Sequence, residues 1–133
     1  MSFLLDTNIV IHARDGDEAV LARRERHIGA AAMSAISFAE LQRGIFKRPD
    51  IGELGLGRLR VIQKSLPVLA FDAPAAEAYG QIIRQCGWAK GRDFDRMIAA
   101  HAISVDATLV TNNAAAFRDI PGLRLEDWVE EPL

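Results

Sequence analysis

The sequence has one cysteine among its 133 residues, few aromatic residues and no long apolar run. Cys86 alone cannot form an internal disulfide, and a single cysteine fits a reducing compartment. No stretch approaches the roughly 20 apolar residues that span a bilayer. The first residues also lack the basic start and long apolar segment of a signal peptide. These absences predict a cytoplasmic protein that makes no membrane contact.

The sequence also lacks a large excess of either charge, because it has 16 basic and 18 acidic residues and a net charge of −2. This balance excludes nucleic-acid binding by overall charge and requires a local basic face instead. Residues 43–64 hold six basic and two acidic side chains, a net +4. That stretch is either a phosphate-binding surface or a solvated helix face.

The length and the 50% content of hydrophobic residues predict a single domain over residues 1–133 with an ordinary core. Short apolar runs alternate with stretches of helical periodicity. Strands are expected at 3–5, 31–33, 68–71, 108–111 and 123–125. Helices are expected at 7–27 with a break near 15–17, then at 36–46, 54–66, 74–86 and 95–105. Apolar strands that alternate with helices predict an α/β fold, with a mainly parallel sheet covered on both faces.

Four polar residues fall where such a sheet binds ligands, at the carboxyl ends of its strands. Asp6 directly follows the first strand, and Asn113 follows the strand at 108–111. Glu40 is expected in the first turn of the helix after the second strand, and Asp95 at the start of another helix. We expect these four side chains to converge although they are distant in sequence.

Three carboxylates at one place repel one another by about 4 kcal/mol per close pair at an effective dielectric constant of 20. Either their pKa values rise or a cation joins them. An oxygen-only ligand set suits Mg²⁺ or Mn²⁺ better than zinc. Such an ion polarises a phosphoryl oxygen and activates water, which is the chemistry of phosphodiester cleavage.

Each residue also has a purely structural interpretation. Ser37 and Glu40 have the spacing of a capping box, with Ser37 as the N-cap. Asp93 and Asp95 suit the positive end of a helix dipole, and Asn113 suits a turn. His101 is expected to be a satisfied, partly buried side chain, and Trp88 and Trp128 are expected to pack rather than to stack on bases.

The combination of these motifs resembles PIN-domain ribonucleases, specifically the VapC-like toxins of bacterial toxin–antitoxin modules. The resemblance runs nearly end to end and rests on five segments: Leu4–Asn8, Ser34–Leu41, Asp95–Ala102, Thr108–Asn113 and Pro121–Trp128. It implies a three-layer α/β/α sandwich and Mg²⁺- or Mn²⁺-dependent endoribonuclease activity. It also implies a cognate antitoxin that covers the active site, a homodimer, and contact with DNA only through that antitoxin.

The family's acidic positions correspond to Asp6, Glu40 and Asp95, which the resemblance makes catalytic residues and metal ligands. A fourth position, often acidic in the family, is Asn113 here, so it can offer the metal an oxygen but no charge. Either Asn113 or Asp93 completes the site. Hydroxyl and amide groups nearby are expected to hold the ligands or their waters: Thr7, Asn8, Ser37 and Thr111.

Two other functions compete with a nuclease. A PIN domain that has lost catalysis would bind RNA as a scaffold, and the missing acid at Asn113 keeps this alternative open. A Mg²⁺-dependent phosphatase or receiver domain also places Asp residues at strand ends. A phosphatase of this kind needs an acid two residues after Asp6, where Asn8 stands, and a receiver needs a lysine beside the site, where Lys90 is not evidently placed. The RNA target stays open.

Overall fold

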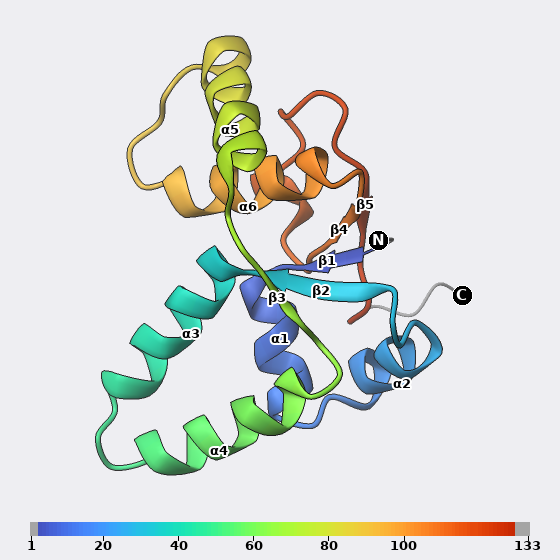
Figure 1. Ribbon diagram of the computed structural model, residues 1–133, viewed down its shortest axis with the longest axis vertical. Coiled ribbons are helices and arrows are strands. Elements are labelled where there is room, and N and C mark those ends of the chain that lie inside the picture. The colour runs from blue at the N-terminus through green and yellow to red at the C-terminus, as the bar shows by residue number, and fades with distance from the viewer. Residues whose placement is uncertain (1–2, 130–133) are drawn as a thin grey trace.

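A computed structural model describes residues 3–129 and contains a five-stranded sheet at its centre (Figure 1). All neighbouring strands are parallel, in the order β3-β2-β1-β4-β5. Their bounds are β1 Phe3–Leu5, β2 Ala31–Ser34, β3 Val68–Leu69, β4 Thr108–Val110 and β5 Leu125–Glu126. The first strand of the chain is therefore the central one, between β2 and β4.

Helices connect the strands and cover both faces of the sheet. They are α1 Thr7–Arg14, α2 Glu18–Arg26, α3 Ala35–Phe46, α4 Gly52–Gln63, α5 Ala73–Cys86 and α6 Asp93–Ser104, with a short 3₁₀ turn at Ala114–Ala116. The expected break between α1 and α2 is present. Gly16 there has a φ of +87°, and the Asp17 side chain caps α2 by accepting from the backbone N–H of Val20.

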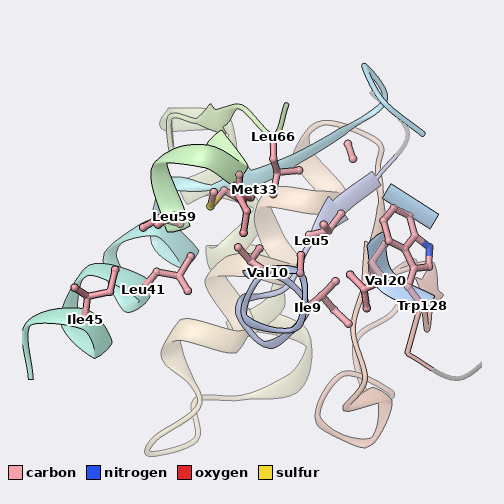
Figure 2. Packing of buried hydrophobic residues seen from close by; sticks show 14 residues of the cluster. Leu5, Ile9, Val10, Val20, Met33, Leu41, Ile45, Leu59, Leu66 and Trp128 are labelled. Atoms are coloured by element: carbon pink, nitrogen blue, oxygen red, sulfur yellow. The ribbon is translucent and has the colours of Figure 1, made fainter. Parts of the chain in front are cut away.

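Alternate side chains along the strands point into two separate hydrophobic cores. Leu5, Met33 and Val110 point to the core formed with α1 to α4, which Figure 2 shows. Their neighbours Leu4, Ala32 and Leu109 belong to a second core, formed with α5 and α6. Figure 1 shows these two groups of helices on opposite sides of the sheet. This period of two confirms the predicted three-layer α/β/α sandwich with a parallel sheet.

Several predicted boundaries were wrong. β3 has two residues rather than four, and β5 begins at Leu125 rather than at 123. The helix expected from 95 begins at Asp93. Sequence periodicity marks the buried middle of an element, whereas its ends depend on hydrogen bonds to other segments.

The expected roles of the aromatic and histidine residues were partly right. Trp128 is fully buried and packs on Phe3 and His27, as predicted. His101 is also buried, with Nδ1 2.7 Å from the Ser34 hydroxyl. Trp88, however, is 63% exposed, so the prediction that it packs was wrong. Among the described helices, none combines the length and the apolarity that a membrane crossing requires.

Candidate active site

Asp6 is the most buried carboxylate of the candidate site and is fixed at the carboxyl end of β1. Its side chain is 5% exposed. Its Oδ1 caps α1 by accepting from the backbone N–H of Thr7 at 2.8 Å, and its Oδ2 accepts from the Thr111 hydroxyl at 2.9 Å. Its backbone N–H also donates to Val110 in β4. Because β1 and β4 are adjacent and parallel, residues 105 positions apart in sequence meet at this edge.

Glu40 joins Asp6 through Thr7. The Thr7 hydroxyl donates to Oε1 of Glu40 at 2.9 Å, while the backbone of the same threonine binds Asp6. Within residues 3–129, Oε1 alone accepts a hydrogen bond, which leaves Oε2 of Glu40 for another ligand.

The capping-box interpretation of Ser37 and Glu40 was wrong, and so was the placement of Glu40 in the first turn. Ser34 is the N-cap of α3 and accepts from Ile36 at 3.1 Å, so α3 starts three residues earlier than a cap at Ser37 would allow. Glu40 then lies in the second turn and faces Thr7 instead of its own helix end. Ser37 is fully buried, and its hydroxyl makes no hydrogen bond within the described part of the chain.

Asp95 comes to the site from the first turn of α6, two residues after the helix begins. Its pKa is raised, chiefly by burial, while the positive charge of Arg92 acts in the opposite direction. Arg92 and Arg96 in turn hold Asp119, at 3.2 Å and 3.1 Å, so the segment after β4 is tied to the start of α6.

The three carboxylates are electrostatically coupled. Burial raises the pKa of Asp6 from 3.8 to about 6, the hydrogen bonds from Thr111 and Thr7 oppose this rise, and the charges of Asp95 and Glu40 add to it. Burial likewise raises the pKa of Glu40, the Thr7 bond opposes it, Asp95 adds to it and Arg43 opposes it. The predicted convergence of Asp6, Glu40 and Asp95 is therefore supported by their mutual repulsion.

These residues fit a hard divalent cation, although they do not form a closed cage. Within residues 3–129, no group of three or more His, Cys, Asp or Glu side chains is arranged to hold a metal ion by itself. Mg²⁺ does not require such a cage, since it usually keeps several waters and binds one or two carboxylates. Burial raises the pKa of each of these acids and so disfavours its ionised form, and a bound cation would oppose that effect.

The other predicted residues lie around this site with different degrees of support. Thr7 and Thr111 hold the carboxylates, as expected.

Asn113 is exposed, and its backbone N–H donates to the Thr111 hydroxyl at 3.1 Å. Asn8 is exposed on α1. Asp93 accepts from Tyr79 at 2.6 Å and from Trp88 at 3.1 Å, so the hydrogen bonds of its carboxylate go toward α5 and the loop after it.

Phe94 was not predicted at the site, and Arg43 was predicted only as part of the basic stretch 43–64, a possible phosphate-binding surface. Phe94 precedes Asp95 and is 45% exposed, and the Arg43 guanidinium lies 5.4 Å from the centre of its ring. Arg43 also lies three residues after Glu40, on the same side of α3. The exposure of Phe94 depends on how α6 packs, so no signal in the sequence could have revealed its role.

Comparison with known proteins identifies close relatives. Residues 3–123 match the family model described as PIN domain. The chain is 35% identical to ribonuclease VapC2 of Rickettsia felis, over 96% of its own length and 98% of the relative's. It is also 35% identical to the tRNA(fMet)-specific endonuclease VapC of Shigella flexneri, with the same coverage. Among solved structures, DNA-bound VapBC from Salmonella typhimurium matches with a TM-score of 0.86 and 34% identity, over 96% of this chain and 98% of that one.

Proposed function

The chain belongs to the PIN-domain family, as a VapC-type endoribonuclease, and on that premise we propose that it is a divalent-metal-dependent toxin neutralised by a cognate antitoxin. The observation that carries this proposal is the hydrogen-bonded series Thr111–Asp6–Thr7–Glu40 at the carboxyl end of β1, with Asp95 coupled to it by charge. Asp6, Glu40 and Asp95 are its catalytic residues.

Asp6, Glu40 and Asp95 would hold Mg²⁺ or Mn²⁺, which would supply positive charge to the phosphate and lower the pKa of a water molecule. The chain's own groups prepare the site. Thr111 and the N–H of Thr7 fix both oxygens of Asp6, and the Thr7 hydroxyl fixes Oε1 of Glu40. Held this way, the carboxylates need no reorganisation when the cation and RNA bind. Asn113 and Asp93 remain the two candidates for completing the ligand set.

The water oxygen attacks phosphorus, and a site carboxylate accepts the water proton. One phosphorus–oxygen bond of the RNA backbone breaks, and the leaving ribose oxygen takes up a proton from solvent water. Asp95 has no hydrogen bond or ion pair from the described residues. It is therefore the carboxylate with the most freedom to accept that proton.

The partner proposal follows from the charge of the site. An empty cluster of carboxylates attracts a guanidinium, which binds carboxylates bidentately. We expect the antitoxin to insert an arginine or lysine there. The related complex from Rickettsia felis, VapBC2, is bound to a DNA fragment from its promoter. We propose that this chain likewise meets promoter DNA in complex with its antitoxin. That it contacts DNA only through the antitoxin and works as a homodimer is a further expectation from the family resemblance.

The test is RNA cleavage by the purified chain with and without metal. EDTA should abolish cleavage, and added Mg²⁺ or Mn²⁺ should restore it. Asp95→Asn protein purified in the same way is the control for contaminating ribonuclease. Full cleavage in EDTA by wild type but not by Asp95→Asn contradicts metal dependence. RNA binding without cleavage at any metal concentration supports the scaffold instead.

A further inference from the structure

Two hollows lie next to the acidic site, and they share two residues. One, of about 200 Å³, is lined by Ala39, Glu40, Arg43 and Phe94. The other, of about 310 Å³, is lined by Arg43, Gly91, Asp93 and Phe94. Because Glu40 lines the first hollow, a ligand bound at the catalytic carboxylates can continue into it. Arg43 and Phe94 lie where both hollows meet.

The Phe94 ring is accessible on the rim of this surface. It is 45% exposed, whereas Arg96 and Ile98 further along α6 are buried. A ring that is nearly half exposed gains less from packing than a buried one, and its accessible part can stack on a flat ligand. The Arg43 guanidinium, 5.4 Å from the ring centre, is within the range of a cation–π contact.

Phe94 and Arg43 each lie close to a carboxylate of the proposed catalytic site. Phe94 directly precedes Asp95 on α6, and Arg43 follows Glu40 by three residues on α3. The charge of Arg43 acts on Glu40, which shows that the two groups are close. Arg43 is the cation among the residues that line the two hollows, and Asp93 in the second hollow is already hydrogen-bonded to Tyr79 and Trp88.

Single-stranded RNA offers what this pair of residues can bind, a flat base beside an anionic phosphate. We propose that Phe94 and Arg43 form a subsite for the nucleotide next to the scissile phosphate, in which the base stacks on Phe94 and Arg43 binds a phosphate. This inference rests on the proposed function and adds to it a substrate-positioning surface outside the carboxylates. It also explains how an anionic substrate binds beside three acids.

The experiment measures RNA binding and cleavage separately. Binding of a short fluorescein-labelled single-stranded RNA is followed by anisotropy in an Asp95→Asn background, where the RNA stays intact. Phe94→Ala should weaken binding by about 5-fold to 150-fold, the range for losing one base–aromatic stack. In the enzyme that keeps Asp95, Phe94→Ala should raise KM by a similar factor and change kcat less.

Matched variants separate stacking from other effects. Phe94→Tyr should keep the binding of wild type, whereas Phe94→Leu, which is apolar but cannot stack, should lose it. Arg43→Gln should reduce the slope of log affinity against log salt by about 0.7, the value for one phosphate on a single strand. Ile28→Ala and Arg26→Gln, at exposed positions near the end of α2, are the controls and should change neither property.

An RNA scan identifies the stacked base. When one base of the RNA is removed at a time, the protein that keeps Phe94 should bind more weakly only when the base at one particular position is missing. The Phe94→Ala variant should bind all of these RNAs equally well. Unchanged binding and KM in Phe94→Ala, with normal cleavage by wild type, overturns the subsite and leaves the proposed function intact. Loss of binding in Phe94→Ala without any cleavage by wild type supports the subsite and contradicts the nuclease. If only inhibition by an antitoxin peptide changes, the hollow is a protein-docking site and the proposal is wrong.

Discussion

The two halves of the acidic site are built differently. The strand-end half comprises Asp6, Thr7, Thr111 and Glu40, which are linked by side-chain and backbone hydrogen bonds of 2.8 to 2.9 Å. The helix half comprises Asp95 and Phe94 at the start of α6, and within residues 3–129 no hydrogen bond or ion pair holds the Asp95 carboxylate. Charge couples the halves without any bond between them.

The difference shows which part of the site belongs to the fold and which part is left for ligands. The hydrogen bonds of the strand-end half satisfy buried groups, so its geometry is present before any ligand binds. The helix half is partly exposed and has unused hydrogen-bonding capacity.

Removing a charge from either half should abolish cleavage. Asp6→Asn, Glu40→Gln and Asp95→Asn should each reduce kcat/KM by more than roughly 100-fold, because losing an outer partner of a metal ligand already costs 10- to 100-fold. Glu40→Gln keeps the size of the side chain and its contact with Thr7. Circular dichroism should show folded proteins, and a Glu40→Gln protein as active as wild type would remove Glu40 from the ligand set.

The metal-free protein should lose stability as the pH rises through the titration of Asp6. Its carboxyl has a pKa of about 6 in the folded chain and 3.8 as its ordinary value. A raised pKa gives stability that is complete below the unfolded value and lost as the pH rises through the folded value. A shift of about two units corresponds to a loss on the order of 3 kcal/mol between pH 4 and pH 7.

Urea unfolding in EDTA across this pH range checks the prediction. Asp6→Asn should remove most of the loss and be at least as stable as wild type at pH 7. Asp95→Asn should remove less of it, because Asp95 is less buried than Asp6. Mg²⁺ should restore the stability of wild type at neutral pH. Equal pH dependence of wild type and Asp6→Asn would show that other groups cause it.

Weakening the hydrogen bonds of the strand-end half should have an intermediate effect. Thr111→Val removes the donor to Oδ2 of Asp6, and the pKa of Asp6 should rise further because that bond lowers it. We expect a 10- to 100-fold loss of kcat/KM and a shift of the acid limb of the pH–rate profile to higher pH.

Thr108→Val is the matched control for Thr111→Val, since Thr108 starts the same strand but does not contact Asp6. Its activity should stay near that of wild type. Equal losses in the two variants would indicate damage to β4 rather than to the site.

The smallest effect is expected at Ser37, which borders neither half through a hydrogen bond. Its buried hydroxyl has no partner among the described residues. Ser37→Ala should therefore raise the metal-free stability slightly, by less than about 1 kcal/mol, since it removes an unsatisfied polar group. Activity should change little. A loss as large as that of Thr111→Val would mean that the Ser37 hydroxyl holds a water of the active site.

The sequence predicted the strand-end half better than the helix half. Apolar runs ending at Asp6 and Thr111 reveal buried strands, and parallel strands must end at one edge, so the convergence of residues near these ends follows from topology. The placement of Glu40 in a capping box was wrong because Ser34 and Ser37 are both plausible N-caps. Only the contact of Ser34 with Ile36 decides between them.

The role of Phe94 could not be predicted because exposure is a property of the tertiary structure. Its neighbours on α6 face α5 and the sheet, and only this packing determines which residues of the helix remain outside. The same limit explains Trp88, which was expected to pack but is exposed beside Asp93.

The pairing of Asp6 with Thr111 has a consequence for the ribosome that synthesises this chain. The central strand β1 emerges early, but its partner β4 and the hydroxyl that holds Asp6 are translated 105 residues later. At 5 to 20 residues per second, roughly 5 to 20 s separate the two. Until then the Asp6 carboxylate lacks its hydrogen bond from the Thr111 hydroxyl. A ribonuclease that threatens the RNA around it is thus unable to complete its active site until most of its own translation is finished.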